Sequence, residues 1–213
     1  MKDVYIIEGL DRLGKSTLIK NIQHRFGFYQ VIHFSKPEIL DKYRLEAATI
    51  PSGQMVAQSF FGEQQYLYQK DSFKNMFRMM STPVVGTRII FDRAHLGEMV
   101  YAPMYRGYAG DYVMDLERMY AMEYSHRVRM ILLIEDFKIS KHFVEDGQSF
   151  DPTKRLQEQN KFIEAFDASI IPDKRVVCVT DPSTGQFKEQ QQILMEATGA
   201  AEENLSSGTN YRS

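Results

Sequence analysis

The sequence predicts an α/β fold in which a five-stranded parallel sheet forms the middle layer of a three-layer sandwich, with helices on both faces. Two observations carry this prediction. Short β-rich segments alternate with longer stretches of helical periodicity, and the first strand leads straight into a glycine-containing loop and a helix. The five expected strands are residues 4–7, 29–34, 87–91, 128–134 and 175–179. A length of 213 residues suits one such domain.

The loop after the first strand has the residue types of a phosphate-binding site. Residues 9–16 read GLDRLGKS, and an apolar stripe that starts at Leu18 and is followed by Gly27 predicts the next helix. Glycines let backbone N–H groups converge on phosphate oxygens, and the helix adds its positive amino-terminal end. This is the Walker A pattern of P-loop NTPases. It predicts an ATP site formed by Gly9, Leu13, Gly14, Lys15, Ser16 and Thr17.

Four side chains near this loop have expected chemical roles. Lys15 is assigned to the β- and γ-phosphates, with its side chain facing ligand or solvent, and the Ser16 hydroxyl is assigned to Mg²⁺. The apolar strand before residue 92 delivers Asp92 and Arg93 to the same edge of the sheet. Asp92 is expected to reach Mg²⁺, directly or through water, and Arg93 to clamp a second phosphate with its planar guanidinium. The alternative is a solvated ion pair at a strand end.

Composition limits the remaining function classes. The formal net charge is −2, from 26 basic and 28 acidic residues, so nucleic-acid binding would need a local basic patch. The single cysteine, Cys178, excludes an intrachain disulfide and is expected to be a buried thiol. No stretch approaches the length of about 18 consecutive apolar residues that a membrane helix needs, so we expect a cytoplasmic protein without a membrane segment.

Two motifs also carry a family resemblance. Residues 8–17, EGLDRLGKST, and Phe91-Asp92-Arg93 resemble the phosphate loop and the Asp-Arg element of the thymidylate kinase and deoxynucleoside kinase superfamily. The resemblance extends to about Thr180, and residues 92–108 resemble thymidylate kinase-like proteins encoded by bacteriophages. By position, it implies that Asp11 contacts the 3′-hydroxyl of the acceptor sugar. It also implies that Arg12 is a catalytic cation over the transferring phosphoryl group, with a solvent-facing loop residue as the alternative.

The same resemblance places an acceptor site. Lys36 stands where thymidylate kinases grip the acceptor phosphate, although it could equally be a surface lysine before the turn at Pro37. Tyr68 falls near the aromatic residue that stacks on the base. Gln69 offers an amide that can pair with a pyrimidine edge. Tyr105 belongs to an aromatic and basic loop that would cover the acceptor, although it could equally pack against the following helix.

The acceptor is expected to be a nucleotide rather than a nucleoside. No carboxylate lies between the second strand and Glu38 that could deprotonate a neutral hydroxyl, whereas a monophosphate is itself an anionic nucleophile. The identity of the base stays open, because the chain departs from the family pattern at two positions. Ser72 stands near the place of the usual base-contacting arginine, and Ala94 stands where many members carry tyrosine.

Residues 1–198 are predicted to form one P-loop nucleotide kinase domain. Its polar segment 137–155 takes the place of the lid that closes over the donor. Lys154 and Arg155 would meet the ATP phosphates from this segment, unless they belong to a solvated charged face. Residues 199–213 are polar and without periodicity, which predicts a disordered tail.

Together, these features predict a thymidylate kinase-like deoxynucleoside monophosphate kinase. It would move the γ-phosphoryl group of MgATP to a small-molecule acceptor, a deoxypyrimidine 5′-monophosphate such as dTMP or a modified analogue, with Lys15, Arg12, Asp92 and Arg93 as catalytic residues. Three alternatives stay open: a kinase for a modified thymine base in DNA, a deoxynucleoside kinase, and a nucleotide-binding regulatory or ATPase module without an acceptor. A homodimer also stays open, as does the cytoplasm of a phage-infected host as the location.

Overall fold

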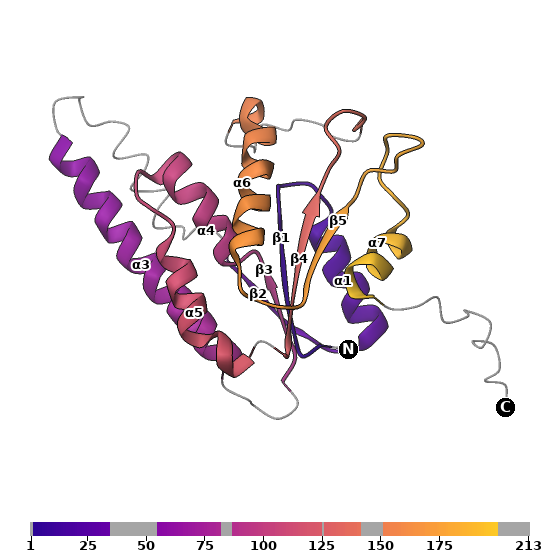
Figure 1. Cartoon of the computed structure of the whole chain (residues 1–213), viewed down its shortest axis with the longest axis horizontal. Coiled ribbons are helices and arrows are strands. Elements are labelled where there is room, and N and C mark those ends of the chain that lie inside the picture. The colour runs from indigo at the N-terminus through magenta and orange to yellow at the C-terminus, as the bar shows by residue number, and fades with distance from the viewer. Residues whose placement is uncertain (1, 35–54, 82–86, 125, 142–150, 200–213) are drawn as a thin grey trace.

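The computed structural model describes residues 2–34, 55–81, 87–124, 126–141 and 151–199 (Figure 1). The predicted tail from residue 200 onward, Lys36 and most of the predicted lid therefore lie outside the described residues. In chain order the elements are β1 (Val4–Gly9), α1 (Lys15–Phe26), β2 (Gln30–His33), α3 (Met55–Ser81), β3 (Ile89–Asp92), α4 (His95–Tyr101), the π-helical turn η1 (Ala102–Arg106), α5 (Tyr112–Tyr124), β4 (Val128–Ile134), the 3₁₀ turn η2 (Pro152–Lys154), α6 (Arg155–Ala168), β5 (Lys174–Cys178) and α7 (Gln190–Thr198).

The five strands form one parallel sheet in the order β2-β3-β1-β4-β5. This confirms the predicted fold class, and each observed strand overlaps its predicted segment. β1 lies in the centre, and the chain adds β2 and β3 on one side of it and β4 and β5 on the other. Ligands of such open sheets collect at the carboxyl ends of the strands, at the point where the strand order reverses. The carboxyl end of β1 is that point here.

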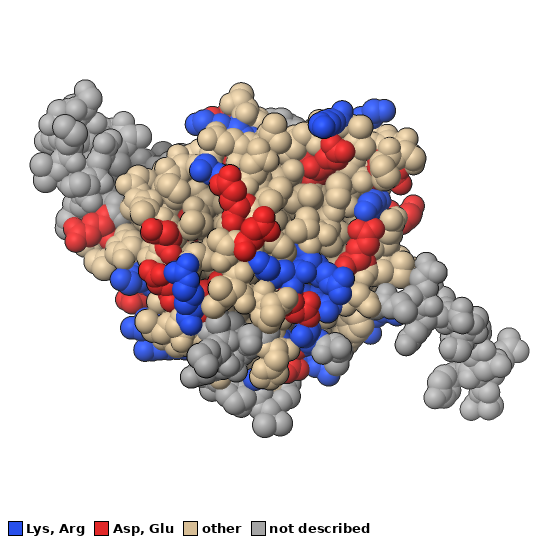
Figure 2. Space-filling view, viewed as in Figure 1, with Lys and Arg blue, Asp and Glu red and all other residues tan. Residues whose placement is uncertain are grey.

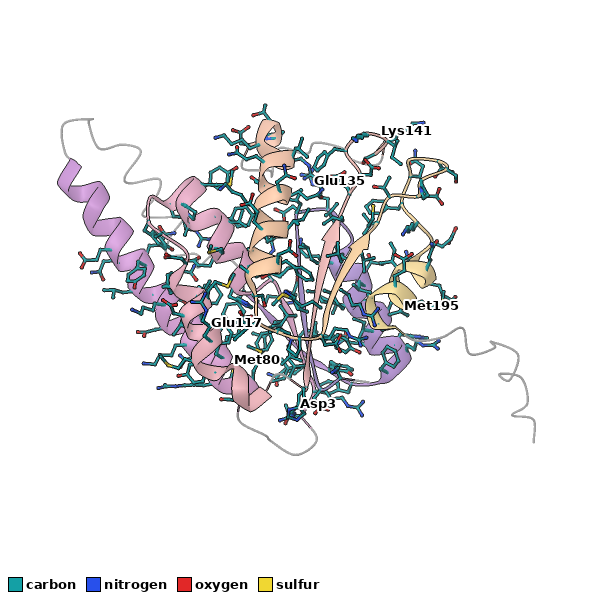
Figure 3. All side chains as sticks on the ribbon, viewed as in Figure 1. Asp3, Met80, Glu117, Glu135, Lys141 and Met195 are labelled. Carbon is teal, nitrogen blue, oxygen red and sulfur yellow. The ribbon has the colours of Figure 1, made fainter. Side chains whose placement is uncertain are left out.

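Helices cover both faces of the sheet. Figure 1 shows α3, α4, α5 and α6 on one side and α1 and α7 on the other. Every residue of β1 and β3 is buried, as expected for central strands that have helices above and below them. Apolar side chains fill both spaces between sheet and helices, so the carboxyl ends of the strands are held by a continuous core (Figure 3).

The boundaries of α1 follow the predicted signals. The helix begins at Lys15, directly after Gly14 (φ +81°), and it ends at Phe26, before Gly27 (φ +89°). Leu18, Ile19 and Ile22 are its buried stripe.

The prediction of a buried Cys178 is wrong. The thiol is only partly buried, because β5 is an edge strand, which has a neighbouring strand on one side only. None of the helices in the described part of the chain has the length and apolar character needed to cross a membrane.

Candidate active site

The loop between β1 and α1 has the backbone of a phosphate cradle. Gly9 has a φ of +130°, and a Cβ added there would lie 2.4 Å from the carbonyl oxygen of Leu133, so only glycine fits. Leu10 and Leu13 are buried and anchor the loop to the core, so Leu13 can contact a ligand only through its backbone. Gly14 caps α1 without any side-chain hydrogen bond, and the first N–H groups of the helix are left for an anion.

Lys15 lies beneath this loop. Its side chain is 7% exposed, and Nζ donates hydrogen bonds to the carbonyl oxygens of Gly9 (2.9 Å) and Leu10 (2.6 Å). We expected the Lys15 side chain to face ligand or solvent, but in the structure it is buried and its ammonium group is hydrogen-bonded to the loop carbonyls. Burial is the main cause that lowers the pKa of Lys15 to about 8. Ser16 and Thr17, by contrast, are exposed in the first turn of α1.

Asp92 lies at the carboxyl end of β3, next to His33 at the end of β2. The two residues are register partners in the sheet, and His33 Nδ1 lies 2.8 Å from Asp92 Oδ2. The other carboxylate oxygen, Oδ1, is buried and has no hydrogen-bond partner in the described part of the chain. A buried carboxylate oxygen without a partner is costly unless a cation or an ordered water meets it. Asp92, together with Ser16, therefore has the chemistry to hold Mg²⁺.

Charged residues from three elements meet around Asp11. Its carboxylate pairs with the Arg93 guanidinium, and its Oδ1 lies 3.8 Å from Lys15 Nζ. Arg155, at the start of α6, is buried against Glu135, with Nη2 2.5 Å from Oε1, and its Nη1 lies 3.4 Å from the Asp11 carbonyl oxygen. The structure thus brings Asp11, Lys15, Arg93 and Arg155 together.

Lys154, the other cation predicted in the lid, is half-exposed. Its Nζ lies 3.1 Å from Asp151 Oδ2 on the same turn, so it is not part of the group around Asp11. Arg12 lies in the loop with a left-handed backbone, φ +67°, and Arg93 has φ +65°. These are the two non-glycine residues with positive φ in the described part of the chain.

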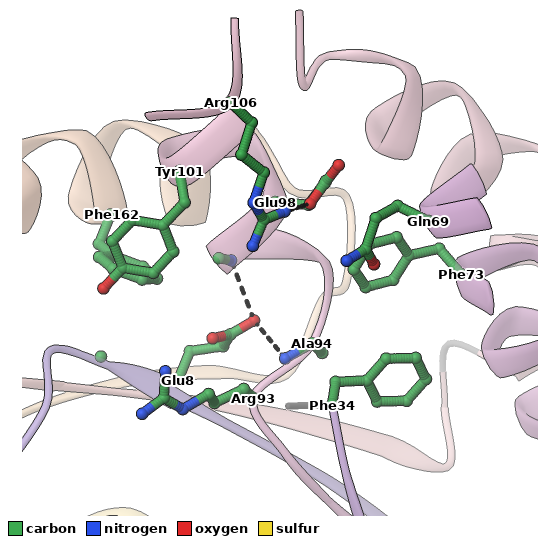
Figure 4. A pocket seen from close by; sticks show the side chains of 12 residues that line it. Glu8, Phe34, Gln69, Phe73, Arg93, Ala94, Glu98, Tyr101, Arg106 and Phe162 are labelled. Carbon is green, nitrogen blue, oxygen red and sulfur yellow. Dashed lines mark hydrogen bonds and ion pairs between the residues drawn. The ribbon is translucent and has the colours of Figure 1, made fainter. Parts of the chain in front are cut away.

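A pocket opens beside this charged group, between α3 on one side and α4 and α6 on the other (Figure 4). Aromatic rings form much of its wall, and two arginines, two glutamates and one amide face it. Its lining residues are Glu8, Gly9, Phe34, Gln69, Phe73, Arg93, Ala94, Gly97, Glu98, Tyr101, Arg106 and Phe162. Phe34 and Phe73 stack on each other, with ring centroids 5.4 Å apart. Arg93 belongs to both the pocket and the group around Asp11.

The predicted acceptor residues divide into two sets. Gln69 is 6% exposed and faces the pocket, and within the described residues its amide makes no hydrogen bond. Tyr68 is 51% exposed and does not line the pocket, and neither does Tyr105, whose hydroxyl donates a hydrogen bond to Glu158. Phe73, one helical turn after Gln69, lines the pocket with its aromatic ring.

Two pocket carboxylates were missed by the sequence reasoning. Glu98 accepts hydrogen bonds from Arg106, Tyr108 (2.7 Å) and Tyr112 (2.8 Å). Glu8 Oε1 accepts backbone N–H groups at the start of α4. The expectation of a nucleotide acceptor considered only the segment after the second strand, and it did not take into account the two carboxylates that line the pocket, Glu8 and Glu98. The position of Glu8, at the end of β1 and directly before the phosphate loop, was an available signal.

Comparisons with known proteins support the fold. No protein-family model matches the sequence, and no curated protein matches it. The chain is similar in structure to the YorR protein from Bacillus subtilis, solved in complex with phosphorylated GDP, at 14% identity and a TM-score of 0.51, covering 82% of this chain and 85% of that one. It is also similar to thymidylate kinase from Candida albicans, at 20% identity and a TM-score of 0.51, covering 91% of this chain and 88% of that one.

A third solved structure is thymidylate kinase from Ehrlichia chaffeensis. Its identity is 11% and its TM-score 0.50, and the match covers 91% of this chain and 95% of that one. At these identities the three similarities show that this chain has the fold of P-loop kinases. They do not assign a substrate.

Proposed function

We propose that this chain is an ATP-dependent nucleotide kinase that moves the γ-phosphoryl group of MgATP to the 5′-phosphate of a deoxypyrimidine monophosphate, dTMP or a modified analogue. One observation carries the proposal. Arg93 faces both the group formed by Lys15 and Asp11 and the aromatic pocket. A single guanidinium at that junction can bind an acceptor phosphate while the loop holds the donor.

The donor side of the site follows from the loop. Phosphate oxygens that enter the cradle would take the free N–H groups of α1 and draw the Lys15 ammonium away from its carbonyl partners. Mg²⁺, held by Ser16 and Asp92, would neutralise charge on the β- and γ-phosphates. Arg12 and Arg155 add cations at the loop, where positioning and charge stabilisation supply most of the catalysis of phosphoryl transfer.

The acceptor side follows from the pocket. In this proposal a planar base stacks on an aromatic side chain that lines the pocket, such as Phe73 or Tyr101, and the Gln69 amide donates one hydrogen bond to it and accepts another. The N3 and O4 edge of a thymine-like pyrimidine needs that pair. Two of the structural neighbours are thymidylate kinases and a third carries phosphorylated GDP, which supports a nucleotide ligand for this chain.

The test is acceptor-dependent ADP release from MgATP. Purified protein would be assayed with the deoxynucleoside monophosphates, with nucleosides and with DNA. We expect the highest kcat/KM with a pyrimidine monophosphate, and we expect Gln69→Ala to raise the KM of that acceptor. Arg118→Ala is the matched control, because Arg118 is exposed on α5 and pairs only with its neighbour Asp115 within the described residues. ADP release that no acceptor stimulates would favour the ATPase alternative.

A further inference from the structure

His95 is a buried polar side chain that the proposed function does not use. It is the first residue of α4, it is fully buried, and it is not among the residues that line the pocket. Its Nε2 lies 3.2 Å from Oε1 of Glu117, which is buried on α5 (Figure 3 labels Glu117). Phe77 of α3 packs against the imidazole, with ring centroids 5.1 Å apart. His95 therefore joins α4 to both α5 and α3.

Glu117 is also held by the segment between α6 and β5. Its Oε1 accepts the Ser169 hydroxyl (2.6 Å), and its Oε2 accepts the N–H group of Ile170 (3.1 Å). Burial raises the pKa of Glu117, but its contacts with His95 and the other two donors lower it by a larger amount, so this pKa lies below the usual range. Glu117 is then a carboxylate, which can only accept hydrogen bonds, and His95 Nε2 carries the proton of the contact between them.

This contact lies two residues after Arg93, the proposed contact for the acceptor phosphate. Arg93 has a left-handed backbone, which a residue with a side chain keeps only where the surrounding structure enforces it. On one side, Arg93 N donates to the carbonyl oxygen of Ile7 in β1 (2.9 Å). On the other side, the chain passes through Ala94 to His95, whose ring is fixed by Glu117. The strained residue is thus held between two fixed points.

Glu8 holds the same turn, but it does not fix the direction of the turn. Its Oε1 accepts three N–H groups at the start of α4, those of Ala94, Leu96 and Gly97 (Figure 4). Hydrogen bonds that meet at one atom leave the helix free to rotate about that atom. The contact of His95 with α5 supplies a second point of attachment, and two separate points restrict this rotation.

We propose that His95 and Glu117 are positioning residues for acceptor binding. Their hydrogen bond fixes the turn between β3 and α4, and it thereby sets the direction in which the Arg93 guanidinium enters the pocket. The inference rests on the proposed function, since it takes Arg93 as the contact for the acceptor phosphate. Neither positioning residue touches the acceptor. Loss of their hydrogen bond should therefore weaken acceptor binding through Arg93 and leave ATP binding at the phosphate loop unchanged.

The test is steady-state kinetics of the wild type and His95→Phe, with a pyrimidine monophosphate and MgATP each varied. Phenylalanine keeps a ring against Phe77 and removes the donor, while Glu117 keeps its two other partners. We expect the KM of the acceptor to rise by about 10-fold, the effect of losing a charged hydrogen bond, and the KM of ATP to change by less than about twofold. His95→Gln, whose amide N–H can replace that of Nε2, should recover most of the acceptor affinity.

Phe77→Leu is the matched control, because it disturbs the packing on the same imidazole and leaves the hydrogen bond in place. It should lower the free energy of unfolding and keep the acceptor KM within about twofold of the wild type. A purely structural role of His95 would lower the apparent kcat, because less of the protein would be folded, and it would leave both KM values unchanged. That result would overturn the inference.

A double-mutant cycle decides whether His95 acts through Arg93. In Arg93→Ala the group that His95 positions is already lost, so adding His95→Phe should not raise the acceptor KM further. A further rise of the same size in that background would overturn the inference. If His95→Phe fails to fold, Glu117→Gln takes its place. A neutral amide oxygen accepts more weakly than a carboxylate, and the acceptor KM should then rise by about threefold.

Failure of the proposed function would give a different result, a wild type that phosphorylates no pyrimidine monophosphate. The positioning of Arg93 would then be decided without an acceptor, from the hydrogen exchange of the Arg93 amide measured by nuclear magnetic resonance. This amide donates to Ile7 in the wild type. At matched free energy of unfolding, it should exchange about 10-fold faster in His95→Phe than in Phe77→Leu. Equal exchange rates in the two variants would overturn the inference.

Discussion

Arg12 and Arg93 both have left-handed backbone conformations next to the phosphate loop. Such a conformation costs a residue with a side chain about 1–2 kcal/mol, and it persists when the surrounding structure enforces it. Arg93 N donates a hydrogen bond to the Ile7 carbonyl oxygen (2.9 Å), which ties the end of β3 to β1. The strain therefore sets the direction in which two guanidinium groups leave the backbone, and both stand at the site proposed for phosphoryl transfer.

These two arginines should differ in their kinetic effects. Arg12→Ala should lower kcat by about 100-fold with little change in the KM of the acceptor, because a cation over the moving phosphoryl group acts mainly in the transition state. Arg93→Ala should lower kcat and also raise that KM. Steady-state kinetics with varied acceptor measure both. Arg12→Gly, which keeps the backbone unstrained, should match Arg12→Ala in kcat. Unchanged kinetics in both alanine variants would contradict the assignment.

His33 should position Asp92 through the contact between Nδ1 and Oδ2. Without the imidazole, the orientation of the Asp92 carboxylate would no longer be fixed, and residues that orient a metal ligand commonly contribute about 10-fold or more to metal affinity. We expect His33→Ala to weaken the binding of Mn²⁺ to the complex with ADP, measured by electron paramagnetic resonance, and to raise the Mg²⁺ concentration needed for half-maximal activity. His33→Asn should recover part of the affinity, because its amide can donate to the same oxygen. Identical Mn²⁺ affinity in wild type and His33→Ala would contradict this role.

At the scale of elements, local sequence patterns were enough to predict the strands and the ends of the first helix. All five strands, their parallel arrangement and the ends of α1 at Gly14 and Gly27 follow from periodicity and glycine positions. The pocket depends on the rotation of α3 about its axis. Gln69 and Phe73, four residues apart, share the inward face, while Tyr68 lies about 100° away around the helix and is exposed.

Contacts between distant residues could not be predicted in the same way. The N–H groups that engage Glu8 lie 86 to 89 residues away in the sequence. No local pattern shows that a strand-end glutamate will meet the start of another helix. The pairing of Arg155 with Glu135 depends likewise on the packing of α6 beside the end of β4 (Figure 3 labels Glu135).

Asp173 should link β4, β5 and α7. It pairs with Arg129 Nε at 2.9 Å and with Lys2 Nζ at 3.0 Å, and Arg129 also donates to the carbonyl oxygen of Thr198 at the end of α7. Burial raises the pKa of Asp173, but the hydrogen bonds from Arg129 and Lys2 lower it by a larger amount. The pKa of Asp173 therefore lies below its usual range. Asp173→Asn should reduce the free energy of unfolding by about 1–2 kcal/mol at neutral pH, the usual value of partly screened charged hydrogen bonds.

The pH dependence of that loss has a definite sign. The folded pKa of Asp173 is lowered, so its stabilisation is fully present above the unfolded pKa of about 3.9 and is lost as pH falls through the folded pKa. Urea unfolding of wild type and Asp173→Asn should therefore differ at pH 7 and converge in acid. Asp115→Asn, in an exposed pair with Arg118, should change little at either pH. A difference that persists in strong acid would show that the carboxylate charge is not the cause.

At the scale of the whole molecule, cations are paired with acids at both ends of the sheet. At the carboxyl ends of the strands, Lys15 and Arg93 lie against Asp11, and Arg155 pairs with Glu135. At the opposite end, Arg127 pairs with Asp3 and Arg129 with Asp173. On the face seen in Figure 2, Lys and Arg lie among Asp and Glu. Together with the net charge of −2, this distribution favours a small anionic substrate over a long polyanion.

This charge distribution leads to an expectation about salt and DNA. A mononucleotide that binds in the pocket beside Arg93 should keep its KM within about threefold between about 50 and 200 mM NaCl, because few counterions are released and the charges are partly buried. An oligodeoxynucleotide should neither inhibit the reaction nor become phosphorylated. Both points can be checked in one ADP-release assay with the salt and the oligonucleotide varied. A DNA oligonucleotide with a modified thymine base would contradict this expectation if it were phosphorylated and if its affinity fell steeply with salt. That result would identify a DNA-directed kinase, because phosphate contacts along a strand produce such a slope.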